Sequence, residues 1–315
     1  MARVIFMGTP QFAVPSLEVL CAQHQVVWVI TQPDRKRGRG QKVSFSPVKE
    51  AALMRRLPIW QPKTLRTPEA VQRLRETQAD LYVTAAIGHI LTTEILALPP
   101  YGCLNVHASL LPRWRGATPV SAAILHGDAE TGATLMRMDE GVDTGPILAQ
   151  IRCPIRPDDT TETLSERLAR LGAELLATTL PKWLAGEIDP RSQPQEGITF
   201  SRRLRKQDGR IDWRRPAVAI ERMIRAYIPW PGTYTTYRNQ KLDILRARAL
   251  STWSGKEPPG RVIALDQGVA VAAGQGALLL EEIQLAGRRP MFSDAFCRGQ
   301  RGFVGSDLAS DESTP

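Results

Sequence analysis

The fold is decided by the first stretch of the chain, which reads RVIFMGTPQFAVPSLEVLCAQHQVVWVIT (Arg3–Thr31). Its apolar run Arg3–Met7 predicts a buried strand, and a Gly-Thr-Pro turn follows. The apolar residues of Pro10–Cys21 recur at helical spacing, and Gln25–Thr31 predicts a second strand. A strand, a helix and a strand in this order are typical of a doubly wound, parallel α/β sheet. A single glycine follows the first strand where a dinucleotide site has GxGxxG, so the pattern does not favour NAD.

Length and composition predict a globular protein of two domains. The chain has 315 residues, of which 43% are hydrophobic,. No apolar run is long enough to span a bilayer, and the N-terminus does not have the pattern of a signal peptide. The cysteines have no CxxC spacing, which argues against a zinc site or a disulfide framework. This pattern fits a protein of the reducing cytoplasm. They are Cys21, Cys103, Cys153 and Cys297.

Two polar side chains share one face of a strand predicted over Tyr101–His107. Because successive side chains of a strand point to opposite faces, Asn105 and His107 project together. Further along the chain lies an acidic, glycine-punctuated loop, DEGVDTGP (Asp139–Pro146). Its Asp143 could return to meet His107, which would place an amide, an imidazole and a carboxylate in one site.

These three groups suit acyl transfer through a tetrahedral intermediate. The Asn105 amide can donate to an oxyanion, and the His107 imidazole can exchange protons near neutral pH. The Asp143 carboxylate can orient the imidazole and raise its pKa. Taken singly, each of the three is more often structural, so the prediction depends on their combination. Ser109 is not predicted to be a nucleophile, because the GxSxG pattern is absent.

Two motifs carry a resemblance to a known family. LNVHASLLPRWRGATP (Leu104–Pro119), followed by MDEGVDTGP (Met138–Pro146), resembles the signature of the folate-dependent formyltransferases. That signature has Asn-x-His, a Ser-Leu-Leu-Pro loop and a downstream Asp-Thr-Gly aspartate. The chain departs from it at Ile87, where the family often has an aromatic residue before the glycine, and we expect this change to reshape the pterin pocket slightly.

The resemblance implies a donor and a role for each site residue. The donor would be 10-formyltetrahydrofolate, and no metal would take part. Asn105 would donate to the oxyanion, His107 would move protons, and Asp143 would orient His107. Side chains and backbone near the strand ends would bind the folate. These folate-binding residues would be Ser109, Leu110, Leu111, Pro112, Ala86, Ile87, Gly88, Ile90, Leu91, Asp139 and Val142.

Positive charge is concentrated in two regions. The segment RKRGRGQK (Arg35–Lys42) has five basic residues in eight positions and predicts a flexible cationic loop. Residues 201–315 hold 19 lysines and arginines against 12 acidic residues, so this half could meet a polyanion,. With FMGTPQFAVPSL and IRAYIPWPGTYT, these regions resemble the family members that formylate methionine on initiator tRNA. The implied tRNA-binding residues are Arg35, Lys36, Arg37, Arg39, Lys42, Arg205 and Lys206.

Composition also predicts the domain boundaries. The polar stretch Asp189–Gly197 has two prolines and a glycine, which is typical of a linker,. We expect a formyltransferase catalytic domain over residues 1–189, a basic linker over 190–206 and a tRNA-binding domain over 207–315. About five short strands in the last domain predict a small β-barrel of the oligonucleotide-binding type. The polar tail after Gly305 is expected to be disordered, and the family resemblance implies a monomer.

Two other functions are weighed against this one. The first is the same transfer to a small amine such as a nucleotide sugar, which would need neither basic region. The second is an RNA-binding protein with a relict catalytic domain, which would not need an intact set of Asn105, His107 and Asp143.

Overall fold

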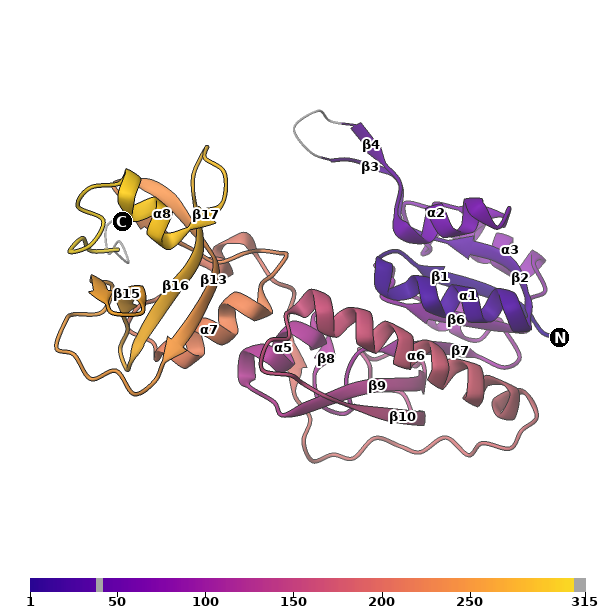
Figure 1. The fold of residues 1–315 in the computed structure, drawn as a ribbon. Helices are drawn as coiled ribbons and strands as arrows, with labels where there is room; N and C mark the ends of the chain where they lie inside the picture. The colour runs from indigo at the N-terminus through magenta and orange to yellow at the C-terminus, as the bar shows by residue number, and fades with distance from the viewer. Residues whose placement is uncertain (38–41, 309–315) are drawn as a thin grey trace. The chain divides into compact units, whose positions relative to one another are not determined.

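The computed structural model describes residues 1–37 and 42–308. Its chain forms two compact units, which Figure 1 shows in the colours of the sequence. The N-terminal unit consists of Met1–Pro119, Ala129–Pro154 and Thr163–Arg202, and the C-terminal unit consists of Val120–Asp128, Ile155–Glu162 and Arg203–Pro315. The C-terminal unit thus includes two short segments that lie before residue 163. The predicted domain boundaries do not include these two segments, and the boundaries stay a prediction.

The opening stretch forms the expected strand, helix and strand. β1 (Arg3–Gly8) is followed by a short 3-10 turn, α1 (Val14–Gln23) and β2 (Gln25–Ile30). β1 and β2 pair in parallel, and all four residues from Val4 to Met7 in β1 are fully buried. The apolar run therefore became an interior strand because both of its faces are covered by helices.

The sheet of the N-terminal unit has seven strands in the order β10-β9-β7-β6-β1-β2-β5. Its remaining strands are β5 (Ile59–Trp60), β6 (Leu81–Ala85), β7 (Cys103–His107), β9 (Glu130–Arg137) and β10 (Ile147–Pro154). The five neighbouring strands β7, β6, β1, β2 and β5 run parallel to one another. β9 pairs antiparallel with β7, and β10 pairs antiparallel with β9. The strand order reverses between β1 and β6, and open α/β sheets bind ligands at the carboxyl ends of such strands.

Helices cover both faces of this sheet, which confirms the doubly wound α/β prediction. One core cluster joins α1, α2 and α6 to one face, and a second joins α3 and α4 to the other. Ser46 and Thr67 cap α2 and α3, and their side chains accept from the backbone N–H groups of Lys49 and Ala70,. The helices are α2 (Pro47–Met54), α3 (Pro68–Glu76), α4 (Thr93–Leu96) and α6 (Thr161–Leu184).

The basic segment after β2 begins and ends in short strands that were not predicted, and its flexibility stays a prediction. β3 (Arg35–Arg37) and β4 (Lys42–Ser44) pair antiparallel as the two arms of a hairpin. Such a ladder is held by backbone groups, so a run of basic side chains does not prevent it. Residues 38–41, which include Arg39, lie outside the described residues.

The segment predicted as a linker packs on the N-terminal unit up to residue 202. Ile147 and Arg191 exchange backbone hydrogen bonds of 2.8 and 2.9 Å. Further along, β11 (Phe200–Ser201) pairs in parallel with β8 (Arg115–Gly116). A polar composition with two prolines and a glycine predicted a linker here, but backbone groups can pair whatever the side chains are.

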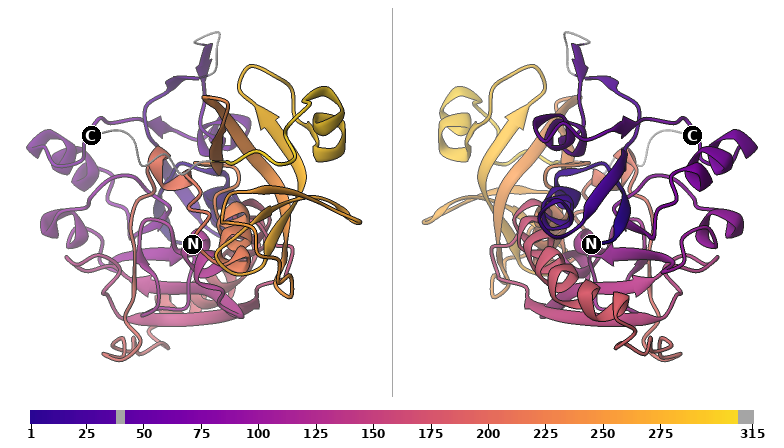
Figure 2. Two further views of the ribbon diagram at one scale, coloured as in Figure 1. Left: turned by 90° about the vertical axis from the view of Figure 1, so that its left-hand side faces the viewer. Right: turned by 90° about the vertical axis from the view of Figure 1, so that its right-hand side faces the viewer.

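The C-terminal unit is built on an antiparallel sheet that curls into a half-barrel (Figure 2). Its strands run in the order β12-β13-β16-β15-β14, and β17 pairs with β16. The five predicted strands are present, and a sixth of two residues was not predicted. The strands are β12 (Tyr234–Tyr237), β13 (Gln240–Leu250), β14 (Val262–Leu265), β15 (Gly268–Ala272), β16 (Ala277–Leu285) and β17 (Met291–Phe292).

Helices and the chain end complete this unit. α5 (Pro119–His126), α7 (Ala217–Ala226) and α8 (Ser293–Gly299) belong to it almost entirely, and the strand-based prediction did not include the last two. The start of the tail was also predicted wrongly: Leu308 is 1% exposed, and its backbone N–H donates to the Gly260 carbonyl at 2.8 Å. Residues 309–315 lie outside the described part. No helix in residues 1–37 or 42–308 has the length and hydropathy of a membrane span.

Helix α6 is expected to contribute strongly to the stability of the N-terminal unit. Leu176 on this helix is fully buried in the first core cluster. Leu176→Ala should lower the free energy of unfolding by about 2–5 kcal/mol, because it leaves a cavity. Urea unfolding followed by tryptophan fluorescence measures the change. Glu174→Ala, at an exposed position of α6, is the control and should stay within about 0.5 kcal/mol of the wild type,.

Candidate active site

Strand β7 positions the first two predicted site residues. Leu104 and Val106 point into the core cluster formed with α1, α2 and α6. Asn105 and His107 alternate with them, and they are 9% and 6% exposed. The predicted division of the strand into an apolar face and a polar face is therefore confirmed.

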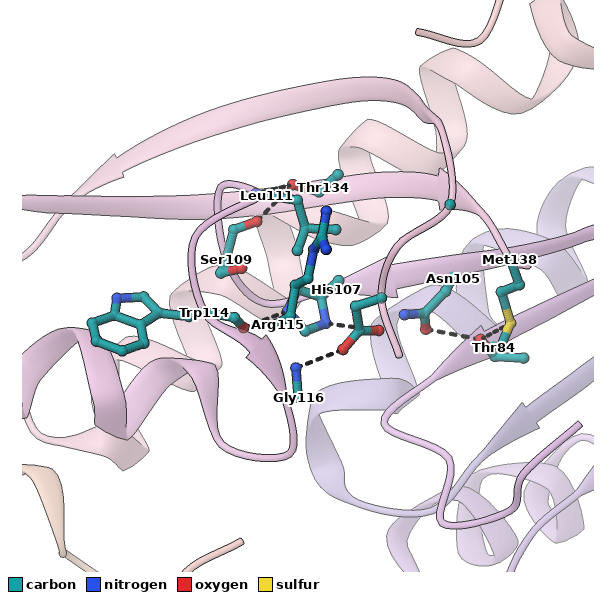
Figure 3. Close-up of polar contacts among 12 residues, drawn as sticks. Thr84, Asn105, His107, Ser109, Leu111, Trp114, Arg115, Gly116, Thr134 and Met138 are labelled. Atoms are coloured by element: carbon teal, nitrogen blue, oxygen red, sulfur yellow. Dashed lines mark hydrogen bonds and ion pairs between the residues drawn. The ribbon is translucent and has the colours of Figure 1, made fainter. Parts of the chain in front are cut away.

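The amide of Asn105 is oriented by Thr84 at the end of β6. Thr84 and Asn105 are paired in the sheet, and Thr84 Oγ1 donates a hydrogen bond of 2.8 Å to Asn105 Oδ1. Figure 3 shows the amide nitrogen turned toward His107 and the amide oxygen toward Thr84. Within residues 1–37 and 42–308, no acceptor engages the two N–H groups of this amide, so they can serve a ligand oxygen.

The imidazole of His107 is held through its Nε2 atom. This atom lies 3.0 Å from the backbone carbonyl oxygen of Trp114. Because a carbonyl oxygen only accepts, Nε2 carries a proton and Nδ1 is the nitrogen that can gain or release one. Trp114 has a positive φ of 59°, which is rare for a residue other than glycine and turns its carbonyl toward the ring,.

Asp143 supplies the third group, on the side of Nδ1. Its Oδ1 lies 3.6 Å from His107 Nδ1, and its side chain is 17% exposed. The other oxygen, Oδ2, accepts a hydrogen bond of 2.7 Å from the backbone N–H of Gly116. The structure thus brings together the three residues predicted to be catalytic, and their role in a reaction stays a proposal.

The loop after β7 is tied to β9 by hydrogen bonds. Ser109 donates from Oγ to the Arg113 carbonyl at 2.6 Å, which closes the loop on itself. Thr134 Oγ1 donates to the Ser109 carbonyl at 2.6 Å and accepts from the backbone N–H of Leu111 at 3.2 Å. The Ser109 hydroxyl therefore bonds within the protein, and contact of this residue with the folate formyl donor stays a prediction.

The apolar side chains of the same loop differ in burial. Leu111 is 3% exposed and packs with Met136 and Ile147. Leu110 packs against β9, and Pro112 is half-buried. These side chains fix the loop on the sheet. Contact with the folate formyl donor would therefore use only the parts of the loop that stay exposed.

The segment after β6 presents backbone and one apolar side chain. Ala86 has a positive φ of 47°, so the chain turns sharply where the strand ends,. Ile87 and Leu91 pack on the second core cluster, and Leu91 is 8% exposed. Ile90 is 67% exposed. Between them, burial lowers the pKa of His89, which favours the neutral imidazole,.

The acidic loop is ordered by its own hydrogen bonds. Asp139 Oδ1 accepts from the backbone N–H of Gly141 at 3.1 Å and from Thr144 Oγ1 at 2.6 Å. Val142 is 64% exposed at the tip of the loop. Asp139 is thus a turn former in the structure, whereas Val142 offers an apolar surface.

The basic residues lie in other parts of the chain. Arg205 and Lys206 are exposed at a 3-10 turn of the C-terminal unit, where Asp208 accepts from the Arg205 backbone N–H at 2.7 Å. The backbones of Arg35, Lys36, Arg37 and Lys42 lie in the β3–β4 hairpin of the N-terminal unit.

Three contributors to the site were not predicted. Thr84 could have been found from the sequence, because adjacent parallel strands place it beside Asn105. The Trp114 carbonyl and the Gly116 N–H carry no sequence signal, since every residue has these backbone groups. In the described part of the chain, no group of His, Cys, Asp and Glu is placed to hold a metal ion.

Comparison with protein families matches both units of the chain. The model described as "Formyl transferase" matches residues 2–180, and the model described as "Formyl transferase, C-terminal domain" matches residues 203–301. The chain belongs to the formyl transferase family. Its N-terminal match contains the whole of the Asn105, His107 and Asp143 cluster.

Relatives within the formyl transferase family are similar over nearly the full chain. A protein of Myxococcus xanthus named methionyl-tRNA formyltransferase is 47% identical over 305 residues, covering 96% of this chain and 97% of its own. A protein of Thiobacillus denitrificans with the same name is 46% identical over 310 residues, covering 98% of this chain and 100% of its own.

Solved structures share the fold at lower identity. WlaRD, described as a sugar 3N-formyl transferase, has a TM-score of 0.67 at 19% identity, covering 92% of this chain and 99% of its own. An N-formyltransferase of Helicobacter canadensis has a TM-score of 0.65 at 19% identity, covering 92% and 100%.

The Thr84–Asn105 hydrogen bond is expected to matter for formyl transfer. Thr84→Val keeps the shape of the side chain but removes the donor, so the Asn105 amide can rotate. We expect kcat to fall about 10-fold, less than the full loss of an oxyanion donor, with the donor KM unchanged. Steady-state kinetics measures both.

Ser16→Ala is the matched control for this substitution. Ser16 is fully buried, and its hydroxyl has no hydrogen-bond partner among the described residues. Its removal should leave kcat unchanged. Equal kcat values for Thr84→Val and the wild type would contradict the role assigned to Thr84.

Proposed function

We propose that this chain transfers the formyl group of 10-formyltetrahydrofolate to the α-amino group of methionine carried by initiator tRNA, for translation initiation. The observation that carries the proposal is the cluster of Asn105, His107 and Asp143, in a formyl transferase chain that aligns over its length with relatives named methionyl-tRNA formyltransferase.

The reaction begins when the neutral amine of methionine attacks the formyl carbon. A carbon–nitrogen bond forms, and the formyl oxygen gains negative charge. The Asn105 N–H groups donate to this oxygen, because Thr84 holds the amide with its nitrogen side toward the site. A donor fixed before the reaction stabilises the tetrahedral intermediate without the cost of reorganisation.

Collapse of the intermediate breaks the bond between the formyl carbon and N10 of the folate. The proton lost by the attacking amine goes to N10, so the products are formylmethionyl-tRNA and tetrahydrofolate. His107 mediates this movement through Nδ1, since Nε2 remains hydrogen-bonded to the Trp114 carbonyl. The Asp143 carboxylate at 3.6 Å stabilises the imidazolium while Nδ1 holds the proton,.

The folate would lie at the carboxyl ends of β6 and β7. The exposed apolar side chains of Ile90 and Val142 fit the faces of an aromatic pterin, and backbone groups of Ala86–Leu91 can bond its edges,. Asp139 supports Val142 by ordering the acidic loop. Ser109–Pro112 would border the donor from the other side.

The tRNA would be held by cationic residues of both units. Arg35, Lys36, Arg37 and Lys42 belong to the hairpin, and Arg39 lies outside the described residues. Arg205 and Lys206 begin the basic half of the chain. Such side chains bind phosphates through charge and do not read sequence. We assign residues 1–189 to catalysis, 190–206 to the connection and 207–315 to tRNA binding, in a cytoplasmic monomer with its four cysteines free.

Acceptor dependence tests the proposed function. Transfer should be fast to methionyl initiator tRNA, and slow to methionyl elongator tRNA, free methionine and an amino sugar nucleotide. Radiolabelled formyl donor measures each rate. Equal rates with the small amines would favour a sugar formyl transferase, and no transfer to any acceptor would favour an RNA-binding protein without activity.

His107→Ala tests the assigned proton transfer. This variant should lose transfer by a factor of at least about 100, while its affinity for tRNA in a filter-binding assay stays near that of the wild type. His24→Ala, at the end of α1 and outside the site, is the control and should keep both. Transfer at the wild-type rate by His107→Ala would refute the mechanism.

A further inference from the structure

Gln193 is a buried polar residue of the segment that was predicted to be a linker. It is 7% exposed and lies in the N-terminal unit. The chain is anchored on both sides of it by backbone pairing, of Arg191 with Ile147 and of Phe200 with Arg115. The segment is thus seated on the unit independently of the Gln193 side chain.

The Gln193 amide makes all four of the hydrogen bonds that it can make, with groups of Arg115, Asp143 and Gly145. Its Nε2 donates to the backbone carbonyls of Asp143 at 2.8 Å and Gly145 at 2.7 Å. Its Oε1 accepts from Nε and Nη2 of Arg115, at 3.1 and 2.8 Å. Two N–H donors and two lone pairs are the full inventory of an amide, so none remains unsatisfied.

These contacts join the two segments that flank the His107 ring. One is the acidic loop, where Asp143 faces Nδ1 and has a positive φ of 53°, a conformation that costs about 1 kcal/mol or more,. The other is the Trp114–Gly116 segment, whose first carbonyl accepts from Nε2 and whose last N–H donates to Asp143. Gln193 donates to backbone carbonyls of the acidic loop and accepts from the Arg115 side chain of the Trp114–Gly116 segment.

We infer that Gln193 is a positioning residue for formyl transfer: it holds Asp143 against His107 by joining the acidic loop to Arg115. This inference rests on the proposed function. The side chain touches no reacting atom and acts through Asp143.

Neither glutamate nor lysine can make all four hydrogen bonds of Gln193,. Glutamate would keep an acceptor for Arg115 but would place a carboxylate oxygen against the carbonyls of Asp143 and Gly145. Lysine would place a second cation beside the Arg115 guanidinium and offer it no acceptor. Buried polar groups left without partners are destabilising, so each change should disturb the loop that carries Asp143.

A double-mutant cycle with Asp143 tests the inference. In the wild-type background, Gln193→Ala should lower kcat by about 10- to 100-fold, since small misplacements of catalytic groups have effects of this size. The KM values for donor and methionyl-tRNA should not change. In an Asp143→Asn background, the same substitution should change kcat by a factor close to one, because residues acting through one group are not additive.

Gln193→Glu provides a second variant in case the alanine variant folds poorly. It keeps the contact with Arg115 but loses both donors to the acidic loop, and it should lose at least as much kcat. Gln72→Ala, an exposed glutamine on α3, is the control and should be unchanged. Circular dichroism of each variant verifies folding.

The outcomes separate the inference from the proposed function. Equal losses of kcat with and without the Asp143 carboxylate, loss confined to KM, or wild-type kcat for Gln193→Glu would each overturn the inference while the wild type remains active. Absence of transfer by the wild-type chain would overturn the proposed function and the inference with it.

Discussion

The hydrogen bond between His107 Nε2 and the Trp114 carbonyl determines how the candidate site can work. Because the carbonyl oxygen accepts a hydrogen bond from Nε2–H, only Nδ1 is left to exchange protons, and Asp143 lies on that side of the ring. The bond requires the chain to return after β7 and to turn at Trp114 with a positive φ. The loop after β7 brings the Trp114 carbonyl to Nε2, and the acidic loop brings Asp143 to the side of Nδ1.

Much of this arrangement could be predicted from local patterns. The alternation of side chains in β7 placed Asn105 and His107 together, because a two-residue period is fixed by strand geometry. The strand, helix and strand at the N-terminus predicted the parallel sheet, because their apolar spacing differs between a helix and a strand. These features depend on residues close in sequence, so their physics is visible in a short window.

Features that depend on distant backbone groups could not be predicted in this way. The β3–β4 hairpin and the pairing of β8 with β11 use amides that every residue has, so charge and proline content misled us. Gln193 lies in a polar stretch whose composition predicted a linker, yet its amide donates to backbone carbonyls about 50 residues earlier. Helix α7 was missed because strands and turns dominate the sequence around it.

The pairing of β8 with β11 has a consequence for how the protein is made. Arg115 and Gly116 gain their strand partners only when Phe200 and Ser201 have been synthesised and have left the ribosome. Contacts so far apart in sequence form late, because a long loop must close first. The sheet can therefore assemble on the nascent chain before Arg115 and Gly116 are paired, and the pairing forms only after nearly two thirds of the polypeptide has been made.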